Sequence, residues 1–271
     1  VELALNDFDE ISRKVPFVCN LQPSGKYPIV SLDASGGIPA VMKTIEKRLH
    51  KDVLTATGKQ LKEQLEDVNV CPDDVLRTME NPQKSEGGIA VLYGNLAPKG
   101  AVVKQSGVRE DMYYFKGKAR VFNSMEEADA AVSADTIEKG TVIVIRYEGP
   151  KGGPGMREML STTALIMGRG MDRDCALITD GRFSGATHGP CIGHISPEAA
   201  AGGPIAFVQD GDEIEIDISN RTLKIDVSEE EFEKRKESWM PLVKPRKPAL
   251  AKYAAMVSSA DTGAVIDVSA L

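Results

Sequence analysis

Apolar residues recur with a helical period through the first third of the chain. Between Pro39 and Leu49, for example, they fall at Val41, Met42 and Ile45 before the last leucine, a spacing typical of one face of an amphipathic helix. Leucines at a similar spacing recur further along. We therefore expect this part to be mostly helical, with helices over 6–14, 39–49, 57–66 and 73–79.

A polar, turn-rich segment over residues 80–88 separates this part from the rest of the chain. We place a domain boundary there, with one unit over 1–86 and a second over 87–271. In the second unit the pattern changes to short apolar and β-branched runs bounded by glycine or proline. Strands are predicted over 89–93, 101–104, 119–122, 141–146, 175–179, 204–209, 213–218 and 222–227.

Helices are also predicted in the second unit. Ser124 and Ser228 each begin a capping box, with a glutamate three residues later, which is a sequence signature of a helix N-terminus. A final helix is expected over 249–257. Because strands and helices do not alternate regularly, the fold class is α/β with a mixed, β-barrel-like sheet and flanking helices, preceded by the mostly helical segment.

The amino-acid composition and charge argue against several classes of protein function. The 271 residues are 42% hydrophobic, carry a net charge of −7 and contain four scattered cysteines. An acidic chain is a poor candidate for binding nucleic acid, and no apolar run approaches the roughly 20 residues of a membrane helix. The cysteines form no C-x-x-C pair, so they do not indicate a local metal site and are better interpreted as free thiols in a reducing compartment such as the cytoplasm.

A glycine-rich segment, Gly152-Gly153-Pro154-Gly155-Met156-Arg157-Glu158, follows the predicted strand over 141–146. Proline is favoured in a first helical turn, so we expect a helix from Pro154 through Met167 with Glu158 near its start. The Glu158 carboxylate there could complement the helix dipole or could bind a hard metal ion. Spacing alone favours the dipole role.

A second polar loop, TDGRFSGATHGP over residues 179–190, follows another apolar strand. Two residues separate Gly181 from Ser184, whereas the G-x-S-x-G elbow of hydrolases has one, and His188 is a weak candidate for a base. Turn geometry is the simpler interpretation, with hydroxyl groups that bond to their own backbone. Two such loops after apolar strands nevertheless suggest strand ends that converge on one site.

Several long motifs resemble the dihydroxy-acid dehydratase family, which is related to the sugar-acid and phosphogluconate dehydratases. They are PSGKY (23–27), GGIAVLYGNLAPKGAVVK (87–104), GPKGGPGMREML (149–160), ALITDGRFSGATHGPCIGHISPEAAAGGPIAFVQDGDEIEID (176–217) and LAKYAAMVSSADTGAV (250–265). The resemblance covers essentially the whole chain and only the C-terminal half of such an enzyme. It implies a swivelling barrel-like domain from about Gly87, preceded by the end of the cluster-bearing domain.

The resemblance implies a hydro-lyase that converts a 2,3-dihydroxy acid, a small molecule, into a 2-keto acid in branched-chain amino-acid biosynthesis. Ser184 is then the base, acting as an alkoxide, while Gly185 and Thr187 bind the substrate and Glu158 is one magnesium ligand. The remaining Mg²⁺ ligands and the iron–sulfur cysteines are expected in the N-terminal half, which is absent here. The resemblance also implies a homodimer. The acidic charge and the lack of a long apolar run argue against nucleic-acid and membrane partners, and the expected location is the cytoplasm.

Alternatives remain at this point. The same family includes sugar-acid dehydratases, although the GMREM motif favours the dihydroxy-acid branch, and a non-catalytic docking module or a serine hydrolase belongs to a different class. Arg157 could pair with a substrate carboxylate or form a structural ion pair, and His188 has no assigned role. The resemblance to only the C-terminal half, with which the start at Val1 agrees, implies a fragment that we expect to be inactive alone.

Overall fold

The computed structural model describes residues 3–268, which form two compact units. The smaller unit comprises residues 9–88. The larger one combines residues 3–8 with residues 89–268. Among the residues described, no helix is long and apolar enough to cross a lipid bilayer.

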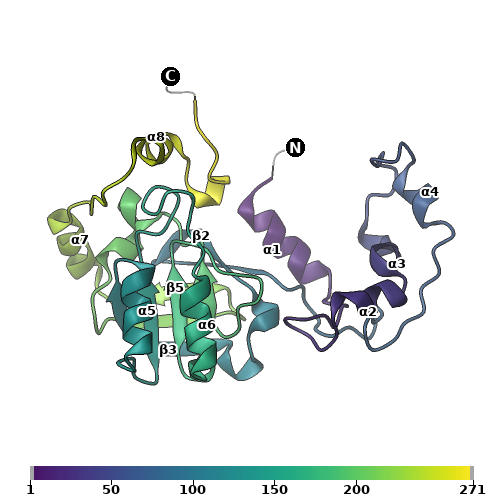
Figure 1. The fold of residues 1–271 in the computed structure, drawn as a ribbon, viewed down its shortest axis with the longest axis horizontal. Coiled ribbons are helices and arrows are strands. Elements are labelled where there is room, and N and C mark those ends of the chain that lie inside the picture. Colours follow the sequence, from purple (N-terminus) through teal and green to yellow (C-terminus); the bar gives the residue numbers. More distant parts are fainter. Residues whose placement is uncertain (1–2, 269–271) are drawn as a thin grey trace. The chain divides into compact units, whose positions relative to one another are not determined.

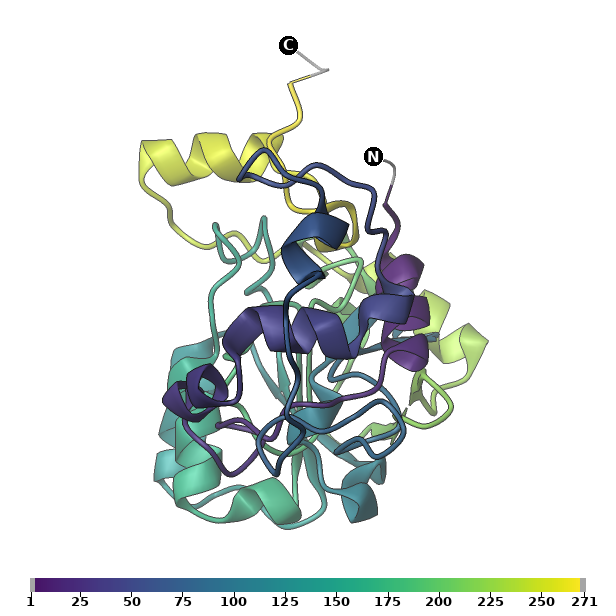
Figure 2. The ribbon, with the colours of Figure 1, turned by 90° about the vertical axis from the view of Figure 1, so that its right-hand side faces the viewer.

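The smaller unit consists of short helices joined by long loops (Figure 2). Its core is small and is formed by Val18, Leu32, Ala40, Val75 and Leu76. The helical elements that lie wholly or partly in it are α1 (Leu5–Lys14), α2 (Ile29–Ala34), α3 (Gly37–Thr44), the 3₁₀ turn Glu46–Arg48 and α4 (Leu61–Leu65).

The helix predicted over 73–79 is wrong. The Asp73 carboxylate instead accepts hydrogen bonds from the backbone N–H groups of Val75 and Leu76, at 2.7 and 2.8 Å. A short acidic side chain that binds nearby N–H groups competes with the helical hydrogen bonds and favours a turn. Helix α1 agrees with the prediction over 6–14, α3 and α4 exist but are shorter than predicted, and α2 was not predicted.

The larger unit is built on a closed barrel of eight strands in the order β1-β2-β6-β5-β4-β3-β7-β8. The pairs β3–β4, β4–β5 and β5–β6 are parallel, whereas β1–β2, β2–β6, β3–β7 and β7–β8 are antiparallel. This confirms the predicted mixed, barrel-like sheet. The strands are β1 (Ala90–Gly94), β2 (Ala97–Val103), β3 (Tyr114–Phe122), β4 (Thr141–Ile145), β5 (Ala176–Thr179), β6 (Cys191–Gly193), β7 (Glu213–Asp217) and β8 (Thr222–Ile225).

The central strand β4 is buried on both faces. Val142 and Val144 belong to the core that contains most of the barrel's buried side chains, while Ile143 and Ile145 pack in a second core. The second core lies under α5 (Met125–Ser133) and α6 (Leu160–Gly168), which are adjacent on the outside of the barrel (Figure 1). A strand covered on both sides has no polar face, which explains its uninterrupted apolar sequence.

The helix starts predicted at Ser124 and Ser228 are confirmed, with each serine as the N-cap. Ser124 Oγ accepts a hydrogen bond from the N–H of Glu127 at the start of α5, and Ser228 Oγ does the same for Glu231 at the start of α7 (Glu229–Ser238). A hydroxyl in this position satisfies one of the unpaired N–H groups at a helix N-terminus. The last helix, α8 (Pro248–Met256), also lies where the sequence predicts it.

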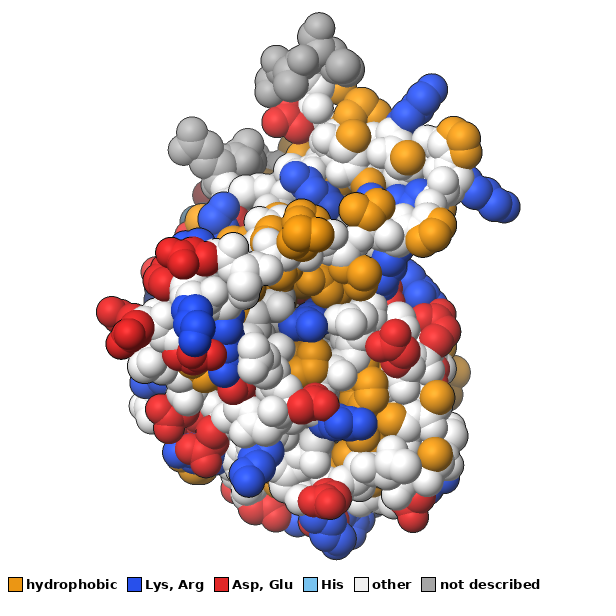
Figure 3. Space-filling model, turned by 90° about the vertical axis from the view of Figure 1, so that its left-hand side faces the viewer, with side chains coloured by type: hydrophobic (Ala, Val, Ile, Leu, Met, Phe, Trp, Pro, Cys, Tyr) orange, Lys and Arg blue, Asp and Glu red, His pale blue; other side chains and the backbone are white. Residues whose placement is uncertain are grey.

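Between α7 and α8 the chain exposes Met240, Leu242 and Val243. On the face drawn in Figure 3, acidic and basic side chains are interspersed and hydrophobic ones gather in the upper part.

Two predicted elements of the larger unit are wrong. Residues 204–207 form a 3₁₀ helix rather than a strand, because their apolar side chains are buried by packing: Phe207 contacts the rings of Phe232 and Trp239 edge-on. The helix expected from Pro154 begins only at Leu160, since Gly155 and Met156 both have positive φ, which interrupts a right-handed helix. Strand β6, three residues long, was not predicted.

Candidate active site at one edge of the barrel

The two polar loops leave the barrel at the same edge. One follows β4 and the other follows β5, and these strands are parallel neighbours in which Val144 pairs with Ile178 and Ile145 pairs with Thr179. The carboxyl ends of parallel neighbours point the same way, so the loops that follow them are close together. We name residues 146–159 the β4 loop and residues 180–190 the β5 loop.

A backbone bridge joins the two loops. Glu158 pairs with Arg182, the N–H of Met159 donates to the carbonyl of Arg182 at 2.7 Å, and the N–H of Arg182 donates to the carbonyl of Arg157 at 3.0 Å. The backbone of Glu158 therefore lies beside a residue that is two positions from Ser184. Sequence reasoning placed these residues at one edge, and the bridge is the local structure that holds their segments together.

The side chain of Glu158 is exposed. Its expected place in the first turn of a helix is wrong, because α6 begins two residues later. In the part of the chain that the structure describes, no side chain or N–H group is hydrogen-bonded to its carboxylate. The carboxylate is therefore open to a ligand.

Asp180 fixes the beginning of the β4 loop. Its buried carboxylate accepts hydrogen bonds from the N–H groups of Tyr147 (3.1 Å), Glu148 (2.9 Å) and Ala199 (2.8 Å). Complete burial raises the pKa of Asp180 to about 6, against the opposing effect of these N–H donors. Tyr147 has a positive φ of 64°, a conformation that an L-residue adopts only when its surroundings hold it there.

Glu198 fixes the middle of the same loop. Its carboxylate accepts hydrogen bonds from the N–H groups of Lys151 and Gly152, both at 2.8 Å, and burial raises its pKa. A Cβ at Gly152 would lie 2.9 Å from the backbone of Tyr147, so the glycine is required for this close approach. Asp180 and Glu198 were not predicted as site residues. The one sequence signal for them was an acidic residue next to glycines, in TDG for Asp180 and in PEAAAGG for Glu198.

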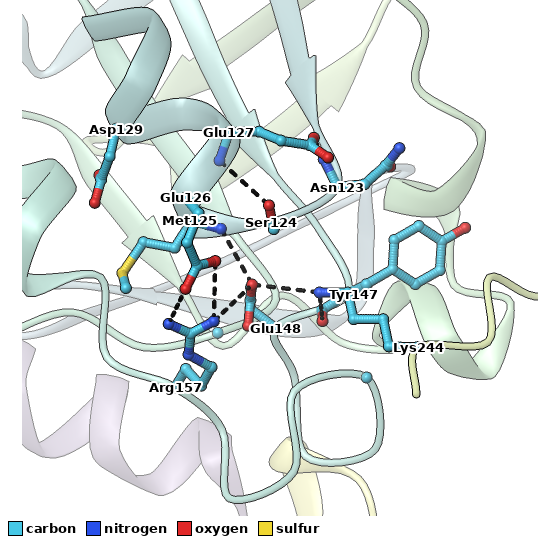
Figure 4. Close-up of polar contacts among 12 residues, drawn as sticks. Asn123, Ser124, Met125, Glu126, Glu127, Asp129, Tyr147, Glu148, Arg157 and Lys244 are labelled. Atoms are coloured by element: carbon cyan, nitrogen blue, oxygen red, sulfur yellow. Dashed lines mark hydrogen bonds and ion pairs between the residues drawn. The ribbon is translucent and has the colours of Figure 1, made fainter. Parts of the chain in front are cut away.

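A third buried acid, Glu148, lies in an ionic cluster (Figure 4). Its Oε1 accepts a hydrogen bond from the N–H of Met125 at 3.1 Å and lies 3.3 Å from Lys244 Nζ and 3.5 Å from Arg157 Nη1. Arg157 also forms a two-pronged pair with Glu126, at 2.6 and 3.1 Å, which raises the pKa of the guanidinium. The structure thus favours the ion-pair role for Arg157.

The hydroxyl of Ser184 takes part in a tight turn. Its Oγ accepts a hydrogen bond from the N–H of Ala186 at 3.0 Å, and its carbonyl accepts one from the N–H of Thr187 at 3.1 Å. No histidine nitrogen within residues 3–268 is hydrogen-bonded to Ser184 Oγ, so the arrangement lacks the serine–histidine pair of a hydrolase.

The neighbours of Ser184 differ in exposure. Gly185 is exposed, and no atom lies within 4 Å of where a Cβ would be. Thr187 is buried, with an exposed fraction of 4%, and its Oγ1 has no hydrogen-bond partner among the residues described. A buried hydroxyl without a partner is uncommon and calls for a group that completes it.

The described residues contain no group of three or more His, Cys, Asp or Glu side chains arranged to hold a metal ion. Cys175 and Cys191 are buried, and burial raises the pKa of Cys191 to about 12, which favours a protonated thiol rather than a metal-binding thiolate. Because no three such side chains converge within residues 3–268, the four cysteines of this chain do not form the ligand set of an iron–sulfur cluster. Glu158 can supply one ligand to a magnesium ion, and the other ligands would have to come from outside the described residues.

Comparison with known proteins defines the class. Residues 74–264 match the family model described as dihydroxy-acid/6-phosphogluconate dehydratase C-terminal, and residues 1–64 match the corresponding N-terminal model. The chain belongs to this dehydratase family.

Curated relatives point to one branch of that family. The chain is 55% identical to the dihydroxy-acid dehydratases of Ignicoccus hospitalis, over 270 residues, and Clostridium novyi, over 271 residues. It is 52% identical over 270 residues to that of Aquifex aeolicus. Each alignment covers 98% of this chain and 49% of the relative. The chain thus spans about half the length of the curated relatives it matches.

Proposed function

We propose that this chain forms the C-terminal half of a hydro-lyase that converts a 2,3-dihydroxy acid into a 2-keto acid. The observation that carries the proposal is the Glu158–Arg182 bridge, because it brings the segment of a free carboxylate beside the segment of Ser184. The curated relatives are named dihydroxy-acid dehydratase, which supports a dihydroxy acid of branched-chain amino-acid biosynthesis as the substrate rather than a sugar acid.

In the proposed reaction, Ser184 removes the proton from C2 of the substrate. The C2–H electron pair forms a C2=C3 bond while the C3–O bond breaks and hydroxide leaves. The proton taken up by Ser184 passes to this hydroxide, which departs as water and restores the serine anion. The resulting enol loses the proton of its C2 hydroxyl and gains one at C3, which gives the 2-keto acid. A serine is a weak base unless its anionic oxygen is stabilised. The N–H of Ala186, 3.0 Å from Ser184 Oγ, is a donor in the right place for this.

Other residues of the chain orient the substrate. We assign one magnesium ligand to Glu158, whose exposed carboxylate suits a hard cation. A bound divalent cation would supply Lewis-acid stabilisation to the substrate carboxylate and the C2 hydroxyl. The open space beside Gly185 leaves room for a ligand, and the unpartnered hydroxyl of Thr187 is a candidate hydrogen-bonding group for it.

The rest of the site is assigned to the half of the enzyme that this chain does not contain. That half would supply the ligands of the iron–sulfur cluster and the remaining magnesium ligands, since the cysteines here do not fit a cluster and three metal ligands do not converge among residues 3–268. We further propose that the complete enzyme is a homodimer, as the family resemblance implies, and that it is cytoplasmic.

The test is Ser184→Ala in the complete enzyme, assayed with 2,3-dihydroxyisovalerate. Removal of the base is expected to lower kcat by at least about a hundredfold. The matched control is Ser219→Ala, at an exposed serine in the β7–β8 turn, with no change in rate expected. A nearly intact rate for Ser184→Ala would contradict the proposal and favour a docking role. Turnover by this chain alone would contradict the assignment of the missing groups to the other half.

The branch is tested with the same enzyme. Dehydration of 2,3-dihydroxyisovalerate is expected to exceed dehydration of a sugar acid in kcat/KM. The reverse preference would assign the enzyme to the sugar-acid branch.

A further inference from the structure

Lys104 lies directly beyond the end of β2, next to the β5 loop. Strand β2 pairs with β6, with Val103 opposite Ile192, and β6 follows the β5 loop in the chain. The end of β2 is therefore held beside the loop that carries Ser184. Neither the sequence motifs nor the proposed reaction gives this lysine a role.

Residues 104–107 contact the β5 loop at three points. The ammonium group of Lys104 donates a hydrogen bond to the carbonyl oxygen of Gly185. The N–H of Gly189 donates to the carbonyl of Gly107 at 3.2 Å. A Cβ at Gly107 would lie only 2.7 Å from the carbonyl oxygen of Thr187, so only a glycine allows this contact without a shift of the loop.

The contact made by Lys104 has a specific chemical consequence. The carbonyl of Gly185 and the N–H of Ala186 belong to the same peptide group, and this N–H is the donor to Ser184 Oγ. A cationic donor at the oxygen end of a peptide withdraws electron density from its nitrogen end. The N–H then becomes a stronger donor, because hydrogen bonds in a chain polarise one another.

We propose that Lys104 is a positioning residue for Ser184, acting through the Gly185–Ala186 peptide. It fixes the orientation of that peptide and strengthens its N–H donor, which favours the anionic form of the serine oxygen. The proposal rests on the proposed function, since it assumes that Ser184 is the base.

The surroundings of Lys104 support this role. The side chain is half-buried, and burial lowers its pKa. No carboxylate within residues 3–268 forms an ion pair with it, whereas Lys116, for example, pairs with Glu213. A cation without a counter-ion, desolvated on one side, acts more strongly on the peptide dipole that it contacts.

The first test uses three variants of the complete enzyme. Lys104→Met removes the charge and keeps most of the length of the side chain, and Lys104→Arg keeps the charge. The control is Lys99→Met, at an exposed lysine on β2. We expect Lys104→Met to lower kcat about tenfold, less than the 10²–10³-fold typical of losing a direct oxyanion donor, with KM changed less than about twofold. Lys104→Arg should restore most of the rate, and Lys99→Met should have no effect.

The second test separates this inference from the proposed function. Ser184→Ala alone tests the base. If that variant is slow but Lys104→Met has the wild-type kcat, the inference fails and the proposed function stands. If Ser184→Ala keeps the wild-type kcat, the proposed function fails, and the inference about Lys104 fails with it.

A third measurement does not depend on activity. In this chain labelled with ¹⁵N-alanine, the amide proton of Ala186 is expected to move upfield in Lys104→Met and to stay in place in Lys99→Met. An Ala186 resonance unchanged by Lys104→Met overturns the inference. An equal shift in Lys99→Met overturns it as well, because the effect would not be specific to the contact.

Discussion

The two loops at the edge of the barrel are held by opposite means. The β4 loop is largely buried, and the carboxylates of Asp180 and Glu198 accept hydrogen bonds from its backbone N–H groups. The β5 loop is more exposed around Ser184, and the ammonium group of Lys104, just beyond the end of β2, donates to one of its carbonyl oxygens. Anions thus hold the loop of the candidate metal ligand, and a cation holds the loop of the candidate base.

This difference has a physical reason. A loop whose N–H groups are bound by buried carboxylates is costly to rearrange, because each N–H would lose a charge-assisted partner. Such a loop suits a residue that holds a cation at a fixed position. The base must instead approach the substrate proton, and an exposed loop held at few points leaves that approach open.

The largest effect is expected from Asp180→Ala, which removes the acceptor of three backbone N–H groups. Each orphaned N–H costs about 1–3 kcal/mol, so we expect the free energy of unfolding of the barrel unit to fall by at least about 3 kcal/mol. Urea unfolding followed by the fluorescence of Trp239, the single tryptophan, measures it. The control is Asp111→Ala, at an exposed acid paired only with Arg109 among the described side chains. An equal loss of unfolding free energy in this control would contradict a special role of Asp180.

A second effect concerns pH. The pKa of Asp180 is about 6 in the folded chain, above its ordinary value near 4, so the folded state keeps a proton that the unfolded chain releases. Stability contributed by this group is therefore present below pH 4 and is lost as pH rises through 6. Between pH 4 and pH 6, the free energy of unfolding of the wild type should fall by on the order of 3 kcal/mol relative to that of Asp180→Asn. Parallel stability curves for the two proteins from pH 4 to 7 would contradict this.

Two glycines should behave differently: Gly107, which contacts the β5 loop, and Gly185, which lies within it. Gly107→Ala places a Cβ 2.7 Å from the carbonyl of Thr187, and we expect a loss of about 1–3 kcal/mol, as for other overpacked sites. Gly185→Ala meets no atom within 4 Å, so the melting temperature should hardly change while KM for the dihydroxy acid rises in the complete enzyme. If Gly185→Ala leaves KM unchanged, Gly185 has no substrate-binding role.

The smallest effect is expected from Glu126→Gln, which weakens the exposed side of the Arg157 pair. Glu126 has an exposed side-chain fraction of 63%, and exposed ion pairs contribute about 0.2–1 kcal/mol. Denaturant unfolding should show a loss within that range. A change of several kcal/mol would mean that the ionic cluster around Glu148, rather than Asp180, holds the β4 loop.

Much of the fold could be predicted from local patterns. The serines at positions 124 and 228 cap helices because a hydroxyl three residues before a glutamate satisfies local N–H groups, whatever the rest of the chain does. The apolar runs of β4 and β5 indicated strands, and the loops after them indicated a shared edge. By contrast, the apolar run at 204–207 suited either a strand or a buried turn, and only its packing against Trp239 decided which.

For the site, the sequence by itself determined the polar residues and the strands that they follow, because these are properties of neighbouring residues. Only the tertiary structure decided that Glu158 pairs with Arg182, that Asp180 binds the N–H groups of another loop, and that Lys104 contacts Gly185. These contacts join residues that are 24 to 81 positions apart, and a hydrogen bond at that separation depends on strand order and register, which local periodicity does not encode.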